Sequence, residues 1–517
     1  MPYLRLLTNA LVAGAVGAAM LAHVVLLLNP QLPLRPGVVF SIGWRVLASA
    51  GGVLTAGFFI ASLLRYQATH RSPGWLSLRL LAWMTTLVVG LGGLLAWLNL
   101  SAFEASLSAD AARRFAVATG ALVATAGVLL LIALVHYSFG RHGSRVGGSL
   151  YAIAVVAAVT LPLVARGVGE PVPPPVGVAR AVAPSVRERP AGRVWLVLLD
   201  GASLDYVSPA AAQGRLPQLG RLLDAGASVT LFSIEPREPA PIWASVATGR
   251  YPSGSGVASS ERYRAGYAHL DLLPRYVFAD ALRHLRLIRT EPVDRASLRG
   301  TPLWSILEAS ELSAGIAGWP FARHASSDHG FVLDDMPGST RDPADADRRL
   351  RERFEDALVS HDVQLGSVRY AVLSALGRRG LGRASGIGGR RRLDAAYDFV
   401  DAEIGRLIAR LAPDDLLLVV SGYRLEPASP LDRLRNRLLD DAGLAAEASR
   451  SDGFLLAFGR HVSPGRKSVG AIVDVLPTVL YYLGMPVARD MDGFARTDLF
   501  LGSLTAERPV SFIRSYQ

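Results

Sequence analysis

The chain has 517 residues, of which half are hydrophobic, 19% are charged and none is cysteine, so disulfides and cysteine-ligated metal sites are excluded. Its formal net charge is +11, and residues 1–168, with eleven arginines and two acids, carry +9 of it. Because this charge flanks apolar stretches, it is typical of contact with lipid headgroups, and no nucleic-acid partner is predicted.

Five apolar stretches in the first third of the chain are predicted to be membrane-spanning helices. A helix needs about 20 apolar residues to cross the hydrocarbon core of a bilayer. The stretches are residues 10–28, 46–64, 80–98, 115–139 and 151–164, of which the last is the shortest. Any one of them alone fits a buried core helix, but a succession separated by short, arginine-bearing loops favours a transmembrane domain over residues 1–168. Arg45, at the edge of the second stretch, is predicted to reach the headgroups.

A different composition follows these stretches. Residues 169–191 are rich in proline, glycine and valine, which predicts an extended linker. Over residues 192–517, short apolar runs alternate with helical patterns such as 391–411. The runs predicted to be strands are 194–199, 229–234, 368–373, 416–420 and 454–458. This alternation predicts an α/β domain with a mostly parallel sheet that is covered on both faces. Ligands of such sheets bind beyond the carboxyl ends of the strands.

Four segments of this domain occur in an order and spacing that point to a known family. They are VWLVLLDGASLDYV (194–207), PAPIWASVATGRYPSGSGV (239–257), DDLLLVVSGYRLEP (414–427) and IVDVLPTVLYYLGMPVARDMDG (472–493). Together they resemble the type I phosphodiesterase/nucleotide pyrophosphatase branch of the alkaline phosphatase superfamily. The resemblance implies an alkaline phosphatase-like fold.

The layout of five spans before such a domain is similar to that of lipoteichoic acid synthases and phosphoethanolamine transferases. It implies a multi-pass protein of the cell membrane with an extracytoplasmic soluble domain. The arginines alone support this orientation weakly, because six lie on the inner side and five on the outer side.

The family's chemistry uses two divalent metals, usually zinc, held by Asp and His, which activate a Ser or Thr nucleophile. The resemblance places the first ligand at Asp200, the only family ligand that is retained. The nucleophile position lies just upstream of Trp243 and falls on Arg237 or Pro239, neither of which has a hydroxyl. The sequence therefore predicts that the attacking group is missing.

The other metal positions are also changed. The family's Asp-x-x-Gly-His segment corresponds to the residues from Ser374 to Arg378, and its Ser-Asp-His-Gly segment corresponds to Ser421, Gly422 and Tyr423 with the arginine that follows. Neither segment retains a ligand. The predicted degenerate pocket comprises Arg237, Pro239, Trp243, Ser374, Arg378, Gly422 and Tyr423.

Two arginines in this pocket have alternative interpretations. Arg237 and Arg378 either replace the charge of the metals and hold a phosphate group, or they are solvated surface residues. The second interpretation is favoured because arginines are mostly exposed.

A second set of ligands remains open. Ser327-Asp328-His329-Gly330 spells the family motif, but it precedes a strand-like run, whereas the family motif follows one. If Asp328 and His329 are ligands nevertheless, with Asp200 and a selection from Asp334, Asp335 and His361, the cofactor is zinc or manganese. Otherwise no cofactor is predicted.

Three functions are compatible with these features. The favoured one is a pseudoenzyme that binds a phospho-group or a partner in the cell envelope. The alternatives are an active metal-dependent phosphodiesterase, phosphatase or headgroup transferase, and a structural subunit of a membrane complex. The predicted partners are the lipid bilayer and, for the basic loop 378–392, anionic lipid or an acidic envelope polymer; a membrane protein partner and a solvated loop without any partner are the alternatives.

Overall fold

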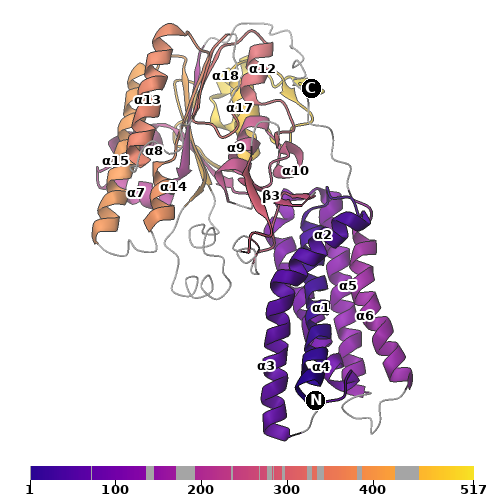
Figure 1. Cartoon of the computed structure of the whole chain (residues 1–517). Coiled ribbons are helices and arrows are strands. Elements are labelled where there is room, and N and C mark those ends of the chain that lie inside the picture. The colour runs from indigo at the N-terminus through magenta and orange to yellow at the C-terminus, as the bar shows by residue number, and fades with distance from the viewer. Residues whose placement is uncertain are drawn as a thin grey trace. The chain divides into compact units, whose positions relative to one another are not determined.

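The computed structural model describes residues 2–70, 73–135, 145–169, 192–234, 237–266, 268–275, 282, 285–293, 297–322, 329–334, 343–380, 387–424 and 453–517 (Figure 1). The chain divides into two units, each with its own internal contacts. The helical unit contains the N-terminal helices and a later segment, Glu261–Pro292. The α/β unit contains the remaining described residues.

The helical unit is built from long apolar helices. Those described are α1 (Pro2–Leu28), α2 (Pro36–Val46), which continues through a π-helical turn (Leu47–Gly51) into α3 (Gly52–Thr69), α4 (Leu78–Phe103), α5 (Ala109–Leu134) and α6 (Arg145–Arg166). Among the described residues, five helical stretches are long and apolar enough to cross a membrane: Pro2–Leu28, Pro36–Thr69, Leu78–Ser106, Ala109–Leu134 and Val146–Arg166. Each predicted stretch falls on one of these helices, although the fourth was predicted to extend past the described end of α5.

Small residues let α1 approach its neighbours closely. A Cβ added to Gly14 of α1 would lie 2.2 Å from Oγ1 of Thr55 on α3. A Cβ added to Gly92 of α4 would lie 2.8 Å from Cβ of Met20 on α1. Packing through small residues is the usual way in which apolar helices associate without a hydrophobic driving force between them. As a result, α1 is the most buried of the five long helices.

The segment Glu261–Pro292 forms a small sheet that belongs to the helical unit. Its strands are β3 (Glu261–Ala265), β4 (Ala268–Leu270) and β5 (Arg289–Pro292), in the antiparallel order β4-β3-β5. We call Glu261–Pro292 the insert, because it interrupts the α/β unit along the chain. Sequence patterns did not indicate that this part of the predicted domain 192–517 would make its contacts with the helices.

Two buried asparagines of the helical unit bind the backbone of the insert. Asn29, just after α1, donates to Leu272 O at 2.8 Å and accepts from Asp271 N at 2.7 Å and from Leu272 N at 3.1 Å. Asn99 of α4 accepts from Arg275 N at 2.8 Å and donates to Arg275 O at 3.3 Å. Because both asparagines are fully buried, these bonds satisfy polar groups that would otherwise be costly to bury.

Arg45, which was predicted to reach lipid headgroups, also binds the insert. Its Nε donates to Leu287 O at 2.9 Å, and its Nη1 donates to Ser41 O at 2.8 Å. The guanidinium is thus held by backbone carbonyls of the protein.

The α/β unit is built on an eight-stranded sheet with the order β11-β2-β10-β9-β1-β8-β6-β7. The strand β10 runs antiparallel to both of its neighbours, and all other pairs are parallel, which confirms the predicted mostly parallel sheet. The strands are β1 (Val194–Gly201), β2 (Ala227–Phe232), β6 (Ala314–Ala317), β7 (Phe331–Leu333), β8 (Leu365–Tyr370), β9 (Leu416–Arg424), β10 (Gly453–Phe458) and β11 (Lys467–Ala471).

Helices cover both faces of this sheet (Figure 1). One face carries α9 (Pro239–Thr248), α12 (Leu303–Ala309) and α17 (Val475–Tyr482). The other carries α7 (Leu204–Ala212), α8 (Pro217–Ala225), α13 (Pro343–Ser360), α14 (Val372–Gly380) and α15 (Ile387–Arg410). The short elements α10 (Pro252–Ser255), α18 (Gly502–Glu507), β12 (Val487–Ala488) and β13 (Phe512–Ile513) complete the unit.

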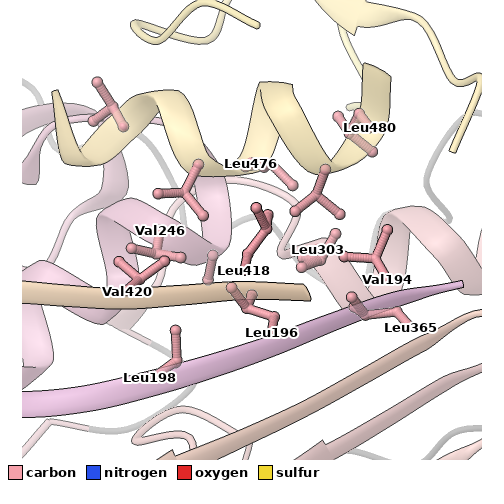
Figure 2. Close-up of a cluster of buried hydrophobic side chains, with 14 of the residues drawn as sticks. Val194, Leu196, Leu198, Val246, Leu303, Leu365, Leu418, Val420, Leu476 and Leu480 are labelled. Atoms are coloured by element: carbon pink, nitrogen blue, oxygen red, sulfur yellow. The ribbon is translucent and has the colours of Figure 1, made fainter. Parts of the chain in front are cut away.

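The core of the α9 and α17 face is aliphatic. Leu196, Leu198 and Leu418 of the central strands point toward Leu476 and Leu480 of α17 (Figure 2). Each such side chain contributes about 1.5–3 kcal/mol by leaving water. The alternation of β1 sends its odd-numbered residues Val197 and Leu199 to the opposite core. The carboxyl end of β1 is therefore fixed from both sides.

Candidate functional site

Asp200 lies at the carboxyl end of β1, where the family's first metal ligand is expected. Its Oδ1 accepts from Nε1 of Trp243 at 2.6 Å and from Nε of Arg369 at 3.2 Å, and its Oδ2 accepts from Nη2 of Arg369 at 2.5 Å. Asp200 and Trp243 are fully buried, and Arg369 is 9% exposed. We call these three residues the Asp200 cluster. Both carboxylate oxygens in it are bound by protein side chains.

The strand register explains why Arg369 reaches Asp200. On β8, Arg369 pairs with Leu198 of β1, and Asp200 follows Leu198 by two residues. Side chains two residues apart on a strand point to the same face, so the guanidinium and the carboxylate share one side of the sheet. The remaining arm of Arg369 donates to Gly318 O, just after β6, at 2.9 Å. The guanidinium therefore ties together the ends of three neighbouring strands.

The Asp200 cluster is a forked ion pair. A guanidinium that binds both oxygens of a carboxylate forms two parallel, charge-assisted hydrogen bonds. A divalent cation that binds both carboxylate oxygens of Asp200 would have to displace Arg369, and the guanidinium would then lie buried beside the metal. Breaking a buried pair in this way costs several kcal/mol. The positive charge at this carboxylate is thus supplied by the chain itself.

The turn after β1 is held from both faces of the sheet. Gly201 has φ of 84°, a conformation that favours glycine. The hydroxyl of Ser421 donates to Ala202 O at 3.0 Å, and Ser203 N donates to the hydroxyl of Tyr397 at 3.0 Å. Burial raises the pKa of Tyr397 well above its usual value, so the phenol stays neutral. These bonds keep Asp200 at a fixed position.

The second predicted metal position, Gly422, is closed by packing. A Cβ added to Gly422 would lie 2.2 Å from Cγ2 of Ile242 on α9. Neither a carboxylate nor an imidazole fits at this position unless the side chain of Ile242 moves. The neighbouring Tyr423 is buried, and its carbonyl oxygen lies 2.9 Å from the hydroxyl of Ser421. The structure thus places a strand–helix contact at the position where the sequence resemblance predicts a family ligand.

The close contact between Gly422 and Ile242 can be tested by substitution. The Gly422→Ala variant is expected to lose about 1–3 kcal/mol of unfolding free energy, because its methyl group overpacks this contact. Gly502→Ala is the matched control, since an added Cβ at Gly502 meets nothing within 4 Å. Thermal denaturation of both purified variants measures the difference. Equal stability of the two variants would contradict the close contact.

The predicted nucleophile position lies at the start of α9. Pro239 is the first residue of the helix, and Arg237 is half-buried two residues before it. Between them, the buried carboxylate of Glu238 accepts from Ser260 N at 2.5 Å and from the hydroxyl of Ser259 at 3.2 Å. No hydroxyl-bearing residue occupies positions 237 to 239. This part of the site holds structural hydrogen bonds and lacks an attacking oxygen.

The third predicted position lies on α14. Ser374 is buried, and its hydroxyl donates to Ala371 O at 3.1 Å. Arg378 belongs to the same helix, but its side chain lies outside the described residues. The alternative interpretations of Arg378 therefore both stay predictions.

The alternative ligands are not brought to Asp200. His329 precedes β7 and His361 precedes β8, so both lie at the amino ends of parallel strands, and both are exposed. The ring of His361 lies 5.4 Å from that of Phe331, at the start of β7. Asp200 lies at the carboxyl edge, roughly 20 Å away along strands that rise about 3.3 Å per residue.

Of the remaining alternatives, Asp334 follows the edge strand β7, whereas Asp328 and Asp335 lie outside the described residues. Within the part of the chain that the structure describes, no group of three His, Asp or Glu side chains is arranged to hold a metal ion.

Arg369 is the residue that sequence reasoning missed. Every residue of β8, LGSVRY, is buried. A charged side chain in a fully buried strand needs an ionic or hydrogen-bonding partner. That rule was the available signal that Arg369 has a buried partner, but it does not say which residue the partner is.

The four segments with family-like sequences are connected in space. Trp243 of the second segment binds Asp200 of the first. Arg250 of the second segment forms an ion pair with Asp490 of the fourth, and Tyr251 N donates to Oδ2 of Asp492 at 2.8 Å. The third segment is β9, which pairs with β1. All four thus belong to one assembly at the sheet.

Comparisons with known proteins identify the family of this domain. The family model of type I phosphodiesterase/nucleotide pyrophosphatase matches residues 194–467, more than half of the chain. No curated protein sequence matches the chain significantly.

Among solved structures, human ectonucleotide pyrophosphatase/phosphodiesterase 5 matches with 13% identity and a TM-score of 0.41, over 60% of this chain and 99% of that one. The murine protein matches with 12% identity and a TM-score of 0.41, over 60% and 100%. An inactive murine variant in complex with AMP matches with 14% identity, a TM-score of 0.41 and coverages of 60% and 100%. By the extent of the family match, the chain belongs to the type I phosphodiesterase/nucleotide pyrophosphatase family of the alkaline phosphatase superfamily.

Proposed function

We propose that this protein is a membrane-anchored pseudoenzyme of its family, whose α/β domain recognises a phospho-group or a partner protein in the cell envelope without cleaving phosphate esters. The observation that carries the proposal is the forked ion pair between Arg369 and Asp200. It supports a site in which a fixed guanidinium has replaced metal charge.

The residues at the site do not fit the family's two metals. A catalytic zinc usually has three protein ligands, whereas Asp200 is the one family ligand retained and both of its oxygens are already bound. Two-metal catalysis also needs an attacking group positioned by the metals. Positions 237 to 239 provide no such group. We therefore assign no hydrolytic step to these residues.

The membrane location is part of the proposal. Five helices of sufficient length and hydropathy support multi-pass insertion. An odd number of spans puts the N-terminus and the α/β domain on opposite sides, and the slight excess of arginine on the N-terminal side favours an extracytoplasmic domain.

Metal analysis combined with an activity assay tests the proposal. The full-length protein, purified in detergent with zinc and manganese supplied, is expected to contain no stoichiometric metal that depends on Asp200. It is also expected not to hydrolyse bis(p-nitrophenyl) phosphate above the blank. The variants for comparison are Asp200→Ala and Asp224→Ala, which removes an exposed carboxylate of α8.

About two bound ions per chain, as a two-metal site requires, together with hydrolysis lost only in Asp200→Ala, would refute the pseudoenzyme proposal. That outcome would restore the metal-dependent enzyme as the function.

A further inference from the structure

A cavity of about 110 Å³ lies within the helical unit, where the end of α3 meets the start of α4. Its polar lining comes from Ser62, Arg65 and Tyr66 of α3 together with Ser77 and Arg79 at the start of α4, and Leu6 and Leu80 contribute apolar walls. The volume is several times the ~10–15 Å³ that one water needs. We call this the α3–α4 cavity.

The lining of the α3–α4 cavity is positively charged, and no acidic side chain among residues 1–168 lies near it. Within residues 1–168 the acids are Glu104 and Asp110, which follow the far end of α4. At 1.5 Å per residue, the length of α4 separates them from Arg79 by roughly 40 Å. Among the described residues, neither Arg65 nor Arg79 has an acidic side chain within ion-pair distance. The start of α4 adds the positive end of a long helix dipole.

A buried hydroxyl in the cavity lacks a partner. Ser62 is 4% exposed, and its Oγ makes no hydrogen bond. Other hydroxyls on these helices, such as those of Thr69 on α3 and Thr85 on α4, donate to the carbonyl four residues earlier. Ser62 lines the cavity, and its hydroxyl does not bond to a carbonyl of α3 as the other hydroxyls do. The hydroxyl is therefore a hydrogen-bond donor that is available to a ligand.

The cavity has a fixed frame. Asn9 of α1 is fully buried, accepts from Ser77 N at 2.8 Å and donates to Gly74 O at 3.1 Å and to Trp75 O at 3.2 Å. The chain that enters α4 is therefore held against α1. A preorganised set of donors loses little freedom when an anion binds.

Apolar side chains are exposed in the segment that leads into α4. Trp75 and Leu76 are 49% and 60% exposed, respectively. A ligand with one anionic end and one apolar end matches both surfaces. Basic pockets between membrane helices bind the headgroups of anionic lipids in this way.

From these observations we propose that the α3–α4 cavity binds the phosphate group of an anionic phospholipid. The guanidinium groups of Arg65 and Arg79 and the hydroxyl of Ser62 contact the phosphate oxygens. The acyl chains lie along the exposed apolar side chains of Trp75 and Leu76. This assignment is independent of the state of the Asp200 cluster, and it rests on the proposed membrane location of the helices.

Native mass spectrometry of the full-length protein in detergent tests the proposal with three probes: phosphatidylglycerol, diacylglycerol and inorganic phosphate. We expect phosphatidylglycerol to bind at one site, diacylglycerol to bind at least about tenfold more weakly because it lacks the phosphate, and inorganic phosphate at equal concentration not to displace the lipid. Displacement by inorganic phosphate, or equal binding of diacylglycerol, overturns the lipid assignment.

Variants locate the site. The double variant Arg65→Gln/Arg79→Gln is expected to weaken phosphatidylglycerol binding roughly 30-fold, and Ser62→Ala about fivefold. The matched control, Arg113→Gln/Arg114→Gln, removes the same charge from α5 and leaves binding unchanged. Size-exclusion chromatography monitors folding, and Ser62→Ala keeps the test valid if the double variant fails to fold. Unchanged binding in Ser62→Ala and in the double variant, or an equal loss in the control, overturns the proposal.

Discussion

Replacing Arg369 by leucine is expected to destabilise the α/β domain by about 3–5 kcal/mol, because Asp200 would remain buried without its counter-ion. The thermal unfolding of the full-length protein in detergent, followed by tryptophan fluorescence, measures this loss. Arg349→Leu is the matched control, since it removes an exposed arginine from α13. It is expected to change the free energy of unfolding by no more than about 0.5 kcal/mol.

A double variant distinguishes the effect of an unpaired buried charge from the effect of changed side-chain packing around Arg369. Asp200→Leu/Arg369→Leu removes both charges, and replacing a buried ion pair by apolar residues is often neutral. The double variant is therefore expected to regain most of the stability that Arg369→Leu loses. If Arg369→Leu were as stable as the unmodified protein, the ion pair would not exist in solution, and Asp200 would be free to bind a metal.

The second large effect is expected at Asn29. In Asn29→Ala, the buried N–H groups of Asp271 and Leu272 and the carbonyl of Leu272 lose their partner. An unsatisfied buried polar group costs about 1–3 kcal/mol, which corresponds to an increase of about 5- to 150-fold in local opening. Hydrogen exchange of peptides covering Glu261–Pro292 measures it.

Gln31→Ala is the control for that experiment. Gln31 lies two residues after Asn29 and donates to Asn29 Oδ1 at 3.3 Å, so its loss leaves the bonds to the insert in place. Exchange in the insert is expected to rise in Asn29→Ala and to stay unchanged in Gln31→Ala. Equal exchange in both variants would show that Asn29 does not hold the insert.

The elements that sequence predicted best are those whose signal is local. The runs 194–199, 416–420 and 454–458 became β1, β9 and β10, because each is a short apolar segment bounded by polar residues. The strand predicted at 368–373 lies earlier in the chain than expected, since β8 ends at Tyr370 and α14 begins at Val372. The apolar pattern continues across that boundary and does not mark it.

The site could be predicted only in part. The losses at Gly422 and at the nucleophile position are visible in the sequence, because they concern which residue is present. The partner of Asp200 is not visible, because Arg369 lies 169 residues away and meets it only through the register of β1 and β8. The docking of the insert on Asn29 and Asn99 is non-local in the same way.

The forked pair between Asp200 and Arg369 also restricts how this lineage can change. Building a metal centre on both oxygens of Asp200 would require removing Arg369, and that substitution alone leaves a buried carboxylate uncompensated. A larger side chain at Gly422 would in turn require Ile242 to move or to become smaller. Each of these single substitutions thus passes through a less stable protein, so the ion pair and the close contact both oppose the gain of a metal site.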